Sequence, residues 1–174
     1  VADVSQVRPA GVDPDVVSTH PPKLAETFVV VADRAQARLF RGTWPDLEDC
    51  REVDGMVHPE SRLRVHDTVS DKPGRFRTPA GQRTAADPNT DFQHRTTSEF
   101  ARRIIARLEQ GRTNEEFGRW ILVAPPTLLG ELRRELPAPL AKLLAAEVEK
   151  ELVHLKPHEI LPHVREAIAN NRHG

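Results

Sequence analysis

Most of the side chains that could bind a charged ligand lie in one stretch of the sequence, between His58 and Arg83. This stretch holds six basic and three acidic residues, a net charge of +3 in a chain whose formal net charge is −1. Arginine and lysine side chains suit contacts with the phosphates of a polyanion, and glycine lets a backbone come close to one. The candidate binding residues are Arg62, Arg64, Lys72, Arg75, Arg77, Gly81, Gln82 and Arg83.

The same stretch has the composition of a long loop. Residues 70–88 contain three prolines, two glycines and almost no apolar side chain. Structureless loops of this length are uncommon in compact domains unless they have a function. We therefore predict a polyanion-binding loop over residues 62–83, and a solvated connector between two elements is the alternative.

Three histidines near the C-terminus have spacings similar to those of zinc ligands. His158 and His163 resemble the HExxH motif of zinc proteases, but the second histidine comes one position late. Pro162 would also break the helix that has to place both ligands on one face. His154 and His158 are four residues apart, but Pro157 lies between them. The histidines are therefore predicted to be surface residues.

Two further residues could take part in chemistry. Asp33 ends an apolar run and could bind a metal there, but two-metal chemistry needs more carboxylates at neighbouring strand ends. The later run that ends at Ala124 is followed by two prolines and supplies none. We predict that Asp33 caps its own turn. Cys50, the single cysteine, is predicted to be a small core residue. No metal or cofactor is expected, and a protein without catalytic activity is favoured over an enzyme.

The composition of the whole chain limits its class. With 174 residues, 38% of them hydrophobic, the chain has enough apolar material for a single core. No run of about 18 apolar residues is present, so no membrane span is expected. A single cysteine and the lack of a visible secretory signal predict a cytoplasmic protein. Residues 1–26 show no periodic pattern and are predicted to form a flexible tail before one domain over residues 27–174.

Strand patterns dominate the first part of this domain. The β-branched run at 28–31 predicts a strand that is buried on both faces, and residues 36–41 predict its hairpin partner. A third strand is predicted over residues 47–57, with Leu47, Val53 and Val57 as its apolar residues, and a fourth over residues 120–124. With helices between them, these strands predict a mixed sheet in an α/β fold.

Helical patterns fill the rest of the chain. Pro88 is typical of a first helical turn, and Thr96 to Glu99 match a capping box, so the main helix is predicted over about residues 91–110 with Gly111 as its stop. Shorter helices are predicted at 128–136, from Pro137, and from Pro157 with a kink or restart at Pro162. The leucine spacing over 138–152 favours one long helix, although residues 146–152 also alternate as a strand would.

Five phrases, in order, resemble the bacterial host-attachment protein family. They are VVVADRAQARLFRG, MVHPESRLR…SDKPGR, SEFARRI, WILVAPPTLLGELRREL and EVEKELVHLKPHEI, and they cover residues 27–160. The family looks distantly related to the central domain of archaeal and eukaryotic-type peptide-chain release factors. The resemblance implies a ribonuclease-H-like mixed five-stranded sheet with flanking helices and a long basic loop before the main helix. It also implies that residues 146–152 form the fifth strand.

Release-factor domains carry Gly-Gly-Gln at the tip of their loop, where the glutamine assists hydrolysis of the peptidyl ester. Here the matching residues are Ala80, Gly81 and Gln82, so the first glycine is replaced by an alanine that does not share its backbone freedom. A hydrolytic role at Gln82 is therefore the weakest of three hypotheses. The first is a non-enzymatic protein that binds RNA or the ribosome through its basic loop. The second is a protein-interaction factor that affects attachment to host cells indirectly.

Overall fold

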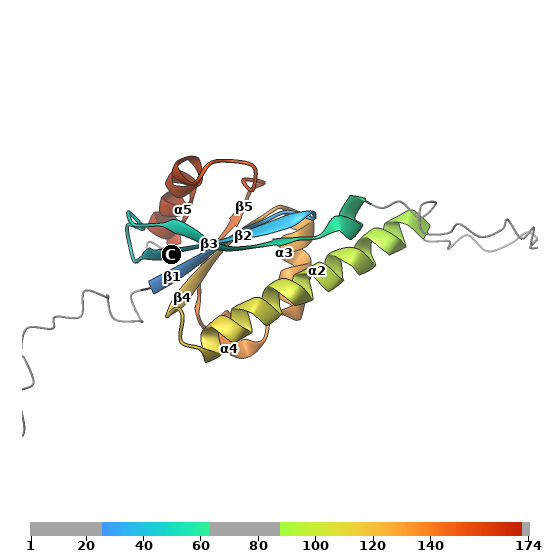
Figure 1. The fold of residues 1–174 in the computed structure, drawn as a ribbon, viewed down its shortest axis with the longest axis horizontal. Coiled ribbons are helices and arrows are strands. Elements are labelled where there is room, and N and C mark those ends of the chain that lie inside the picture. Colours follow the sequence, from blue (N-terminus) through green and yellow to red (C-terminus); the bar gives the residue numbers. More distant parts are fainter. Residues whose placement is uncertain (1–25, 63–87, 172–174) are drawn as a thin grey trace, which may run out of the picture.

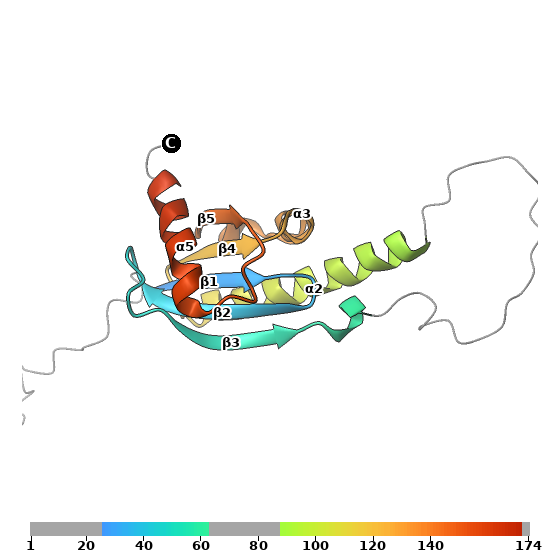
Figure 2. The same ribbon diagram turned by 90° about the horizontal axis from the view of Figure 1, so that it is seen from above.

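The computed structural model describes residues 26–62 and 88–171. Their centre is a five-stranded sheet with the order β3-β2-β1-β4-β5, seen from above in Figure 2. β1 pairs with β2, and β2 with β3, in antiparallel fashion, whereas β1 with β4 and β4 with β5 are parallel. The predicted mixed sheet of an α/β fold is thus confirmed. The strands are β1 (Glu26–Ala32), β2 (Gln36–Thr43), β3 (Arg51–Val57), β4 (Arg119–Ala124) and β5 (Leu144–Glu149).

Helices cover both faces of the sheet (Figure 1). One face carries α2 (Pro88–Thr113), α3 (Pro126–Glu135) and α4 (Ala138–Ala141), and the other carries α5 (Pro157–Asn171). A short 3-10 helix, η2 (Pro59–Arg62), follows β3. Among the described residues, no helix has the length and apolar character needed to cross a membrane.

Successive side chains of β1 and β4 point to opposite faces of the sheet, so each strand contributes to two hydrophobic cores, one on each face. Phe28 and Val30 face the core under α2 and α3, while Val29 and Val31 face the core under α5. All four side chains are at most 1% exposed. The prediction of a first strand buried on both faces is confirmed, because a strand with helices on both sides needs apolar residues at every position.

The main helix begins at Pro88, which the sequence indicated as a first helical turn, but the predicted range of about residues 91–110 and the stop at Gly111 were wrong. α2 begins at Pro88, so Thr96 and Thr97 lie inside it, and their hydroxyls donate to the carbonyl of Gln93 at 3.1 and 2.7 Å. A capping-box pattern indicates where a helix can begin, but an earlier turn makes the cap unnecessary. Gly111 is not the stop either: α2 continues to Thr113, and a Cβ at Gly111 would lie 2.9 Å from the ring of Phe117. The glycine is needed for this close packing.

The third strand is confirmed but is shorter than predicted. Leu47 precedes β3 in a turn, with a φ of 53°, and its side chain is fully buried. Val53 and Val57 belong to β3 and are 37% and 68% exposed. β3 is an edge strand, so one side of it has no neighbour in the sheet.

The ambiguous segment near the C-terminus forms a strand. β5 runs from Leu144 to Glu149, parallel to β4, so the fifth strand that the resemblance implied is confirmed in place of the long helix that periodicity favoured. It begins and ends earlier than the predicted residues 146–152. α5 passes through Pro162 as one helix.

Candidate functional site

The carboxyl ends of the three parallel strands meet at one edge of the sheet. β1 ends beside Asp33, β4 beside Pro125, and β5 shortly before Glu151. The chain leaves β1 toward β2 and leaves β4 toward β5, so the two connections diverge and leave a crevice of the kind in which open α/β sheets bind ligands. A cavity of about 410 Å³, here called the carboxyl-edge cavity, lies at this edge. It is lined by Asp33, Arg34, Ala35, Ser61, Arg62, Pro125, Thr127 and Glu151.

Asp33 organises the turn between β1 and β2. Its Oδ1 accepts hydrogen bonds from the backbone N–H groups of Ala35 at 2.7 Å and Gln36 at 2.8 Å. The residue is only 8% exposed. The predicted capping role is confirmed, and it leaves the second carboxylate oxygen, Oδ2, available for another partner.

That partner is His154, in the connection between β5 and α5. Its Nε2 lies 3.3 Å from Asp33 Oδ2 and 4.0 Å from Glu151 Oε1. Its other ring nitrogen, Nδ1, is 3.5 Å from the side-chain amide of Gln36. Sequence reasoning considered His154 only with His158 and did not connect it with Asp33. In the described part of the chain, the group of side chains placed to share a metal ion comprises Asp33, Glu151 and His154, without His158 or His163.

A second, smaller hollow adjoins the cavity on the side of α2. Its volume is about 140 Å³, and it shares Arg34 and Thr127 with the first. Polar side chains from the first turns of α2 form its other wall, and Arg34 donates to Gln93 Oε1 at 3.3 Å. The remaining lining residues are Thr90, Gln93, His94 and Thr97.

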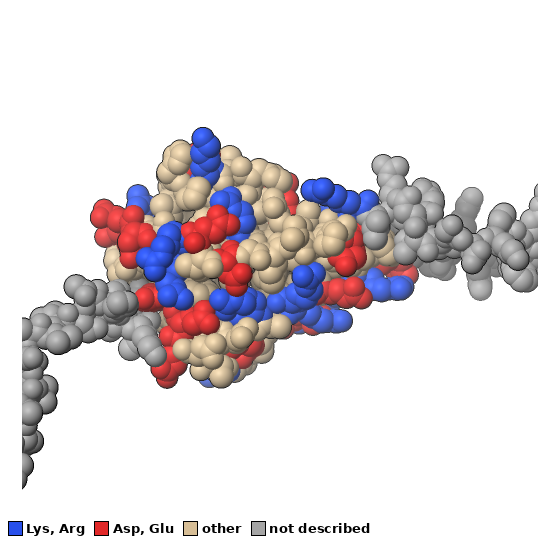
Figure 3. All heavy atoms as spheres, in the orientation of Figure 1, with Lys and Arg blue, Asp and Glu red and all other residues tan. Residues whose placement is uncertain are grey.

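Described residues on either side of positions 63–87 line these two hollows. Arg62, the last residue of η2, lines the larger one, and the first turns of α2, which begins at Pro88, line the smaller one. Figure 3 shows basic side chains, with some acidic ones among them, beside the place where the chain leaves the described residues. Of the predicted binding residues, only Arg62 is described; Arg64, Lys72, Arg75, Arg77, Gly81, Gln82 and Arg83 lie outside the described residues.

His58 fixes η2 against the rest of the site. Its backbone N–H donates to the carbonyl of Ala35 at 2.7 Å, which ties η2 to the turn at Asp33. Its ring is 3% exposed and stacks on Phe100 of α2, with centroids 4.8 Å apart. Burial lowers the pKa of His58, while the charge of Glu60 opposes this shift. The neutral ring is therefore a packing element that joins β3 and η2 to α2.

Ser98 has a hydrogen-bond geometry unlike that of a nucleophile. It lies buried between α2 and α3, where its hydroxyl donates to Glu131 and accepts from Arg134 Nη2. His94 Nδ1 lies 4.0 Å from the opposite oxygen of Glu131. A serine nucleophile needs a histidine that accepts its proton, and here the carboxylate stands between the two. The group holds α2 and α3 together.

Cys50 is also unsuited to nucleophilic chemistry. The thiol is half-buried, and burial, followed by the charge of Asp49, raises its pKa from 9.0 to about 11, although Arg165 opposes this. Only the thiolate reacts. The thiol therefore stays protonated at neutral pH.

We expect a thiol reagent to modify Cys50 roughly a hundredfold more slowly in the folded chain than in the denatured chain at pH 8, since a pKa raised by about two units lowers the thiolate fraction by that factor. Mass spectrometry of iodoacetamide-treated samples measures both rates. The native rate should rise about tenfold per pH unit over this range. Equal rates in the two states would contradict the assignment.

Comparison with known proteins shows the family to which this chain belongs. A search of the curated proteins found no match. The family model described as "Protein required for attachment to host cells" matches residues 28–164, from β1 into α5. The matched range begins before Asp33 and ends after His154, so it includes every residue that lines the carboxyl-edge cavity. Because the match covers well over half of the chain, this protein belongs to the host-attachment protein family.

Proposed function

We propose that this family member is a non-enzymatic protein that binds RNA, free or in the ribosome, through its basic segment at residues 62–83 and the adjoining carboxyl-edge cavity. One observation carries the proposal. Arg62, the first residue of the segment and the one that the structure describes, lines the same cavity as Arg34. Two arginines from different elements thus line one cavity, at a crevice of the kind where α/β sheets bind ligands.

The charge pattern favours an extended polyanion over a single small anion. The basic residues of the segment are spread over residues 62–83 rather than clustered. Spaced charges suit a chain of phosphates, because each neutralised phosphate releases counterions and adds to the affinity. A role in attachment to host cells, which the family description names, would then depend on RNA binding inside the cell.

The relation to release-factor domains is part of the same proposal. The mixed five-stranded sheet, with the basic segment between β3 and α2, supports a ribonuclease-H-like assignment of the fold. The described residues favour binding over chemistry, since Ser98 and Cys50 both lack activation. A protein partner that orders the segment is the competing interpretation.

Replacing Arg34 or Arg62 with alanine tests the proposal. Each change should weaken binding to a single-stranded RNA about fivefold at ~0.15 M salt and lower the slope of log K against log salt by about 0.7. Fluorescence anisotropy at several salt concentrations measures both quantities. Melting temperatures should stay near that of the parent, because both side chains are exposed.

Arg102→Ala is the matched control. Arg102 is an exposed arginine of α2 whose partner is Glu135, and it does not line either hollow. We expect its affinity and salt slope to equal those of the parent. If Arg102→Ala weakens RNA binding as much as the other two variants, net charge alone explains the effect. If Arg34→Ala and Arg62→Ala bind like the parent, the cavity has no part in RNA binding.

A further inference from the structure

We propose that Asp33, Glu151 and His154 bind one divalent transition-metal ion of the Zn²⁺ class at the carboxyl edge of the sheet. The inference goes beyond RNA binding and does not depend on it. The three side chains supply one imidazole nitrogen and two carboxylate oxygens, and these ligand atoms all lie within 4.8 Å of one another.

The separations suit a metal with short bonds. Zinc binds histidine nitrogen and carboxylate oxygen at about 2.1 Å, so two ligand atoms in a tetrahedral site lie about 3.4 Å apart. His154 Nε2 and Asp33 Oδ2 are already 3.3 Å apart. Glu151 Oε1 is 4.0 Å from the same nitrogen and has to move inward to reach this spacing. Its side chain is 60% exposed and free to make this adjustment.

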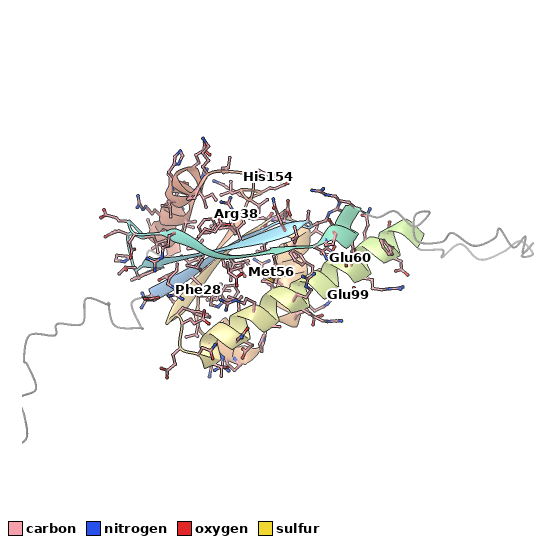
Figure 4. The ribbon with its side chains drawn as sticks, in the orientation of Figure 1. Phe28, Arg38, Met56, Glu60, Glu99 and His154 are labelled. Carbon is pink, nitrogen blue, oxygen red and sulfur yellow. The ribbon has the colours of Figure 1, made fainter. Side chains whose placement is uncertain are left out.

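Two of the three ligands are held in place before any ion arrives. Asp33 is fixed by the hydrogen bonds that its Oδ1 accepts from the turn, which leave Oδ2 directed at His154. The chain on either side of His154 is held by Arg38, which donates to the carbonyl of Val153 at 2.9 Å and that of Leu155 at 2.7 Å. Figure 4 shows Arg38 and His154 on the α5 side of the sheet. A site with such support loses little entropy on binding.

The far side of the imidazole also has a suitable partner. A histidine that binds metal through Nε2 carries its proton on Nδ1 and donates it to a nearby acceptor. Gln36 places its side-chain amide 3.5 Å from Nδ1. Since the oxygen and nitrogen of an amide exchange places on a half-turn, Gln36 can supply that acceptor.

Two carboxylates and two arginines line the cavity, and the carboxylates are the groups that attract a cation. Asp33 and Glu151 face the same cavity as Arg34 and Arg62. Two carboxylates weaken the attraction of this cavity for phosphate, whereas a bound divalent ion neutralises both of them. A set of three protein ligands that includes imidazole leaves a coordination position open, as in catalytic zinc sites. Ca²⁺ and Mg²⁺ prefer six or more oxygen ligands and fit this set less well.

Calorimetric titration of the tag-free, full-length chain with Zn²⁺, after treatment with a chelator, tests the proposal. We expect one ion per chain, and binding of Co²⁺ with visible absorption typical of low coordination. His154→Ala, Glu151→Gln and Asp33→Asn should each weaken Zn²⁺ binding at least about a hundredfold, since loss of even an outer partner costs about 10–100-fold. Asp33→Asn keeps an oxygen that can cap the turn, and circular dichroism verifies that each variant is folded.

His158→Ala is the matched control, because His158 is an exposed histidine near the start of α5 and is not part of the cluster. Zn²⁺ affinity should be unchanged in this variant. The proposal is overturned if the parent binds no Zn²⁺ under these conditions, or if the three ligand variants bind Zn²⁺ as tightly as the parent. The RNA titrations are run with chelator present, so either proposal can fail without the other.

Discussion

Replacing Arg75, Arg77 and Arg83 together with alanine is expected to weaken RNA binding on the order of a hundredfold at ~0.15 M salt. The reason is the number of phosphates that the segment neutralises. Each lost contact to a single strand removes about 0.7 from the slope of log K against log salt, so three lost contacts flatten that slope by roughly two units. Anisotropy titrations across a range of salt concentrations measure the affinity and the slope in one experiment. We expect little change in the melting temperature, because charged side chains that are not buried in ion pairs contribute little to folding.

Two variants of the same segment separate charge from side-chain identity. Replacing the same three arginines with lysine keeps the charge, so most of the affinity and the salt slope should remain. Gln82→Ala removes a neutral amide that releases no counterions, and it should leave binding nearly unchanged. If Gln82→Ala instead abolishes a hydrolytic activity while binding persists, the release-factor-like role is favoured.

The triple alanine variant also distinguishes the remaining interpretations. If it binds RNA as well as the parent at every salt concentration, the segment is a solvated connector and the polyanion hypothesis fails. If the chain associates with a protein partner and this association hardly depends on salt, apolar docking of the segment is favoured, because ionic strength screens charges but leaves apolar contacts in place.

Much of the sheet could be predicted from the sequence because its central strands are continuous apolar runs. β1 and β4 lie between two helical layers, and full burial makes such runs easy to recognise. The bounds of β3 were harder to predict, since an edge strand exposes much of its surface. Its valines are exposed, and the buried Leu47 lies in the turn before it. The capping box at Thr96 failed for a different reason: local patterns describe what a segment can do, and the earlier turn at Pro88 decided where α2 begins.

The site was only partly predictable, because some of its residues lie far apart along the chain. The cap made by Asp33 involves neighbours within three residues and follows from a local pattern. The approach of His154 and Glu151 to Asp33 depends on the parallel pairing of β1, β4 and β5, which brings their carboxyl ends to one edge. No local spacing encodes that pairing. Once residues 144–149 are known to be a strand, the edge position of Glu151 follows from the topology alone.

Trp120→Ala is expected to lower the free energy of unfolding by about 3–5 kcal/mol. The side chain is fully buried in the core under α2 and α3. Its removal would leave a cavity that neighbouring side chains on three elements can close only in part. Chemical denaturation followed by circular dichroism measures the change. A loss below about 1 kcal/mol would contradict the central position that the structure assigns to this residue.

Trp120→Phe is the matched variant, and it addresses why residues 138–152 do not form one long helix. Trp120 donates its indole N–H to the carbonyl of Leu140 and its backbone N–H to that of Leu143, both at 2.9 Å. A continuous helix would need these two carbonyls for its own hydrogen bonds, four residues further along the chain. Phenylalanine keeps a ring in the core but removes the indole donor, at a cost of about 0.5–1.5 kcal/mol, because the Leu140 carbonyl still accepts from the backbone N–H of Leu143 at 3.0 Å.

The location of the effect decides between packing and hydrogen bonding. If the bonds from Trp120 end the helical turn of α4 and direct the chain into β5, Trp120→Phe should increase amide hydrogen exchange in β5 more than in β1. Equal increases in both strands would mean that the indole contributes only through packing. Leucine spacing over 138–152 satisfies a helix, yet β4 supplies the competing donors to Leu140 and Leu143. The strand therefore forms because of a partner some twenty residues away, which the periodicity of the segment itself does not contain.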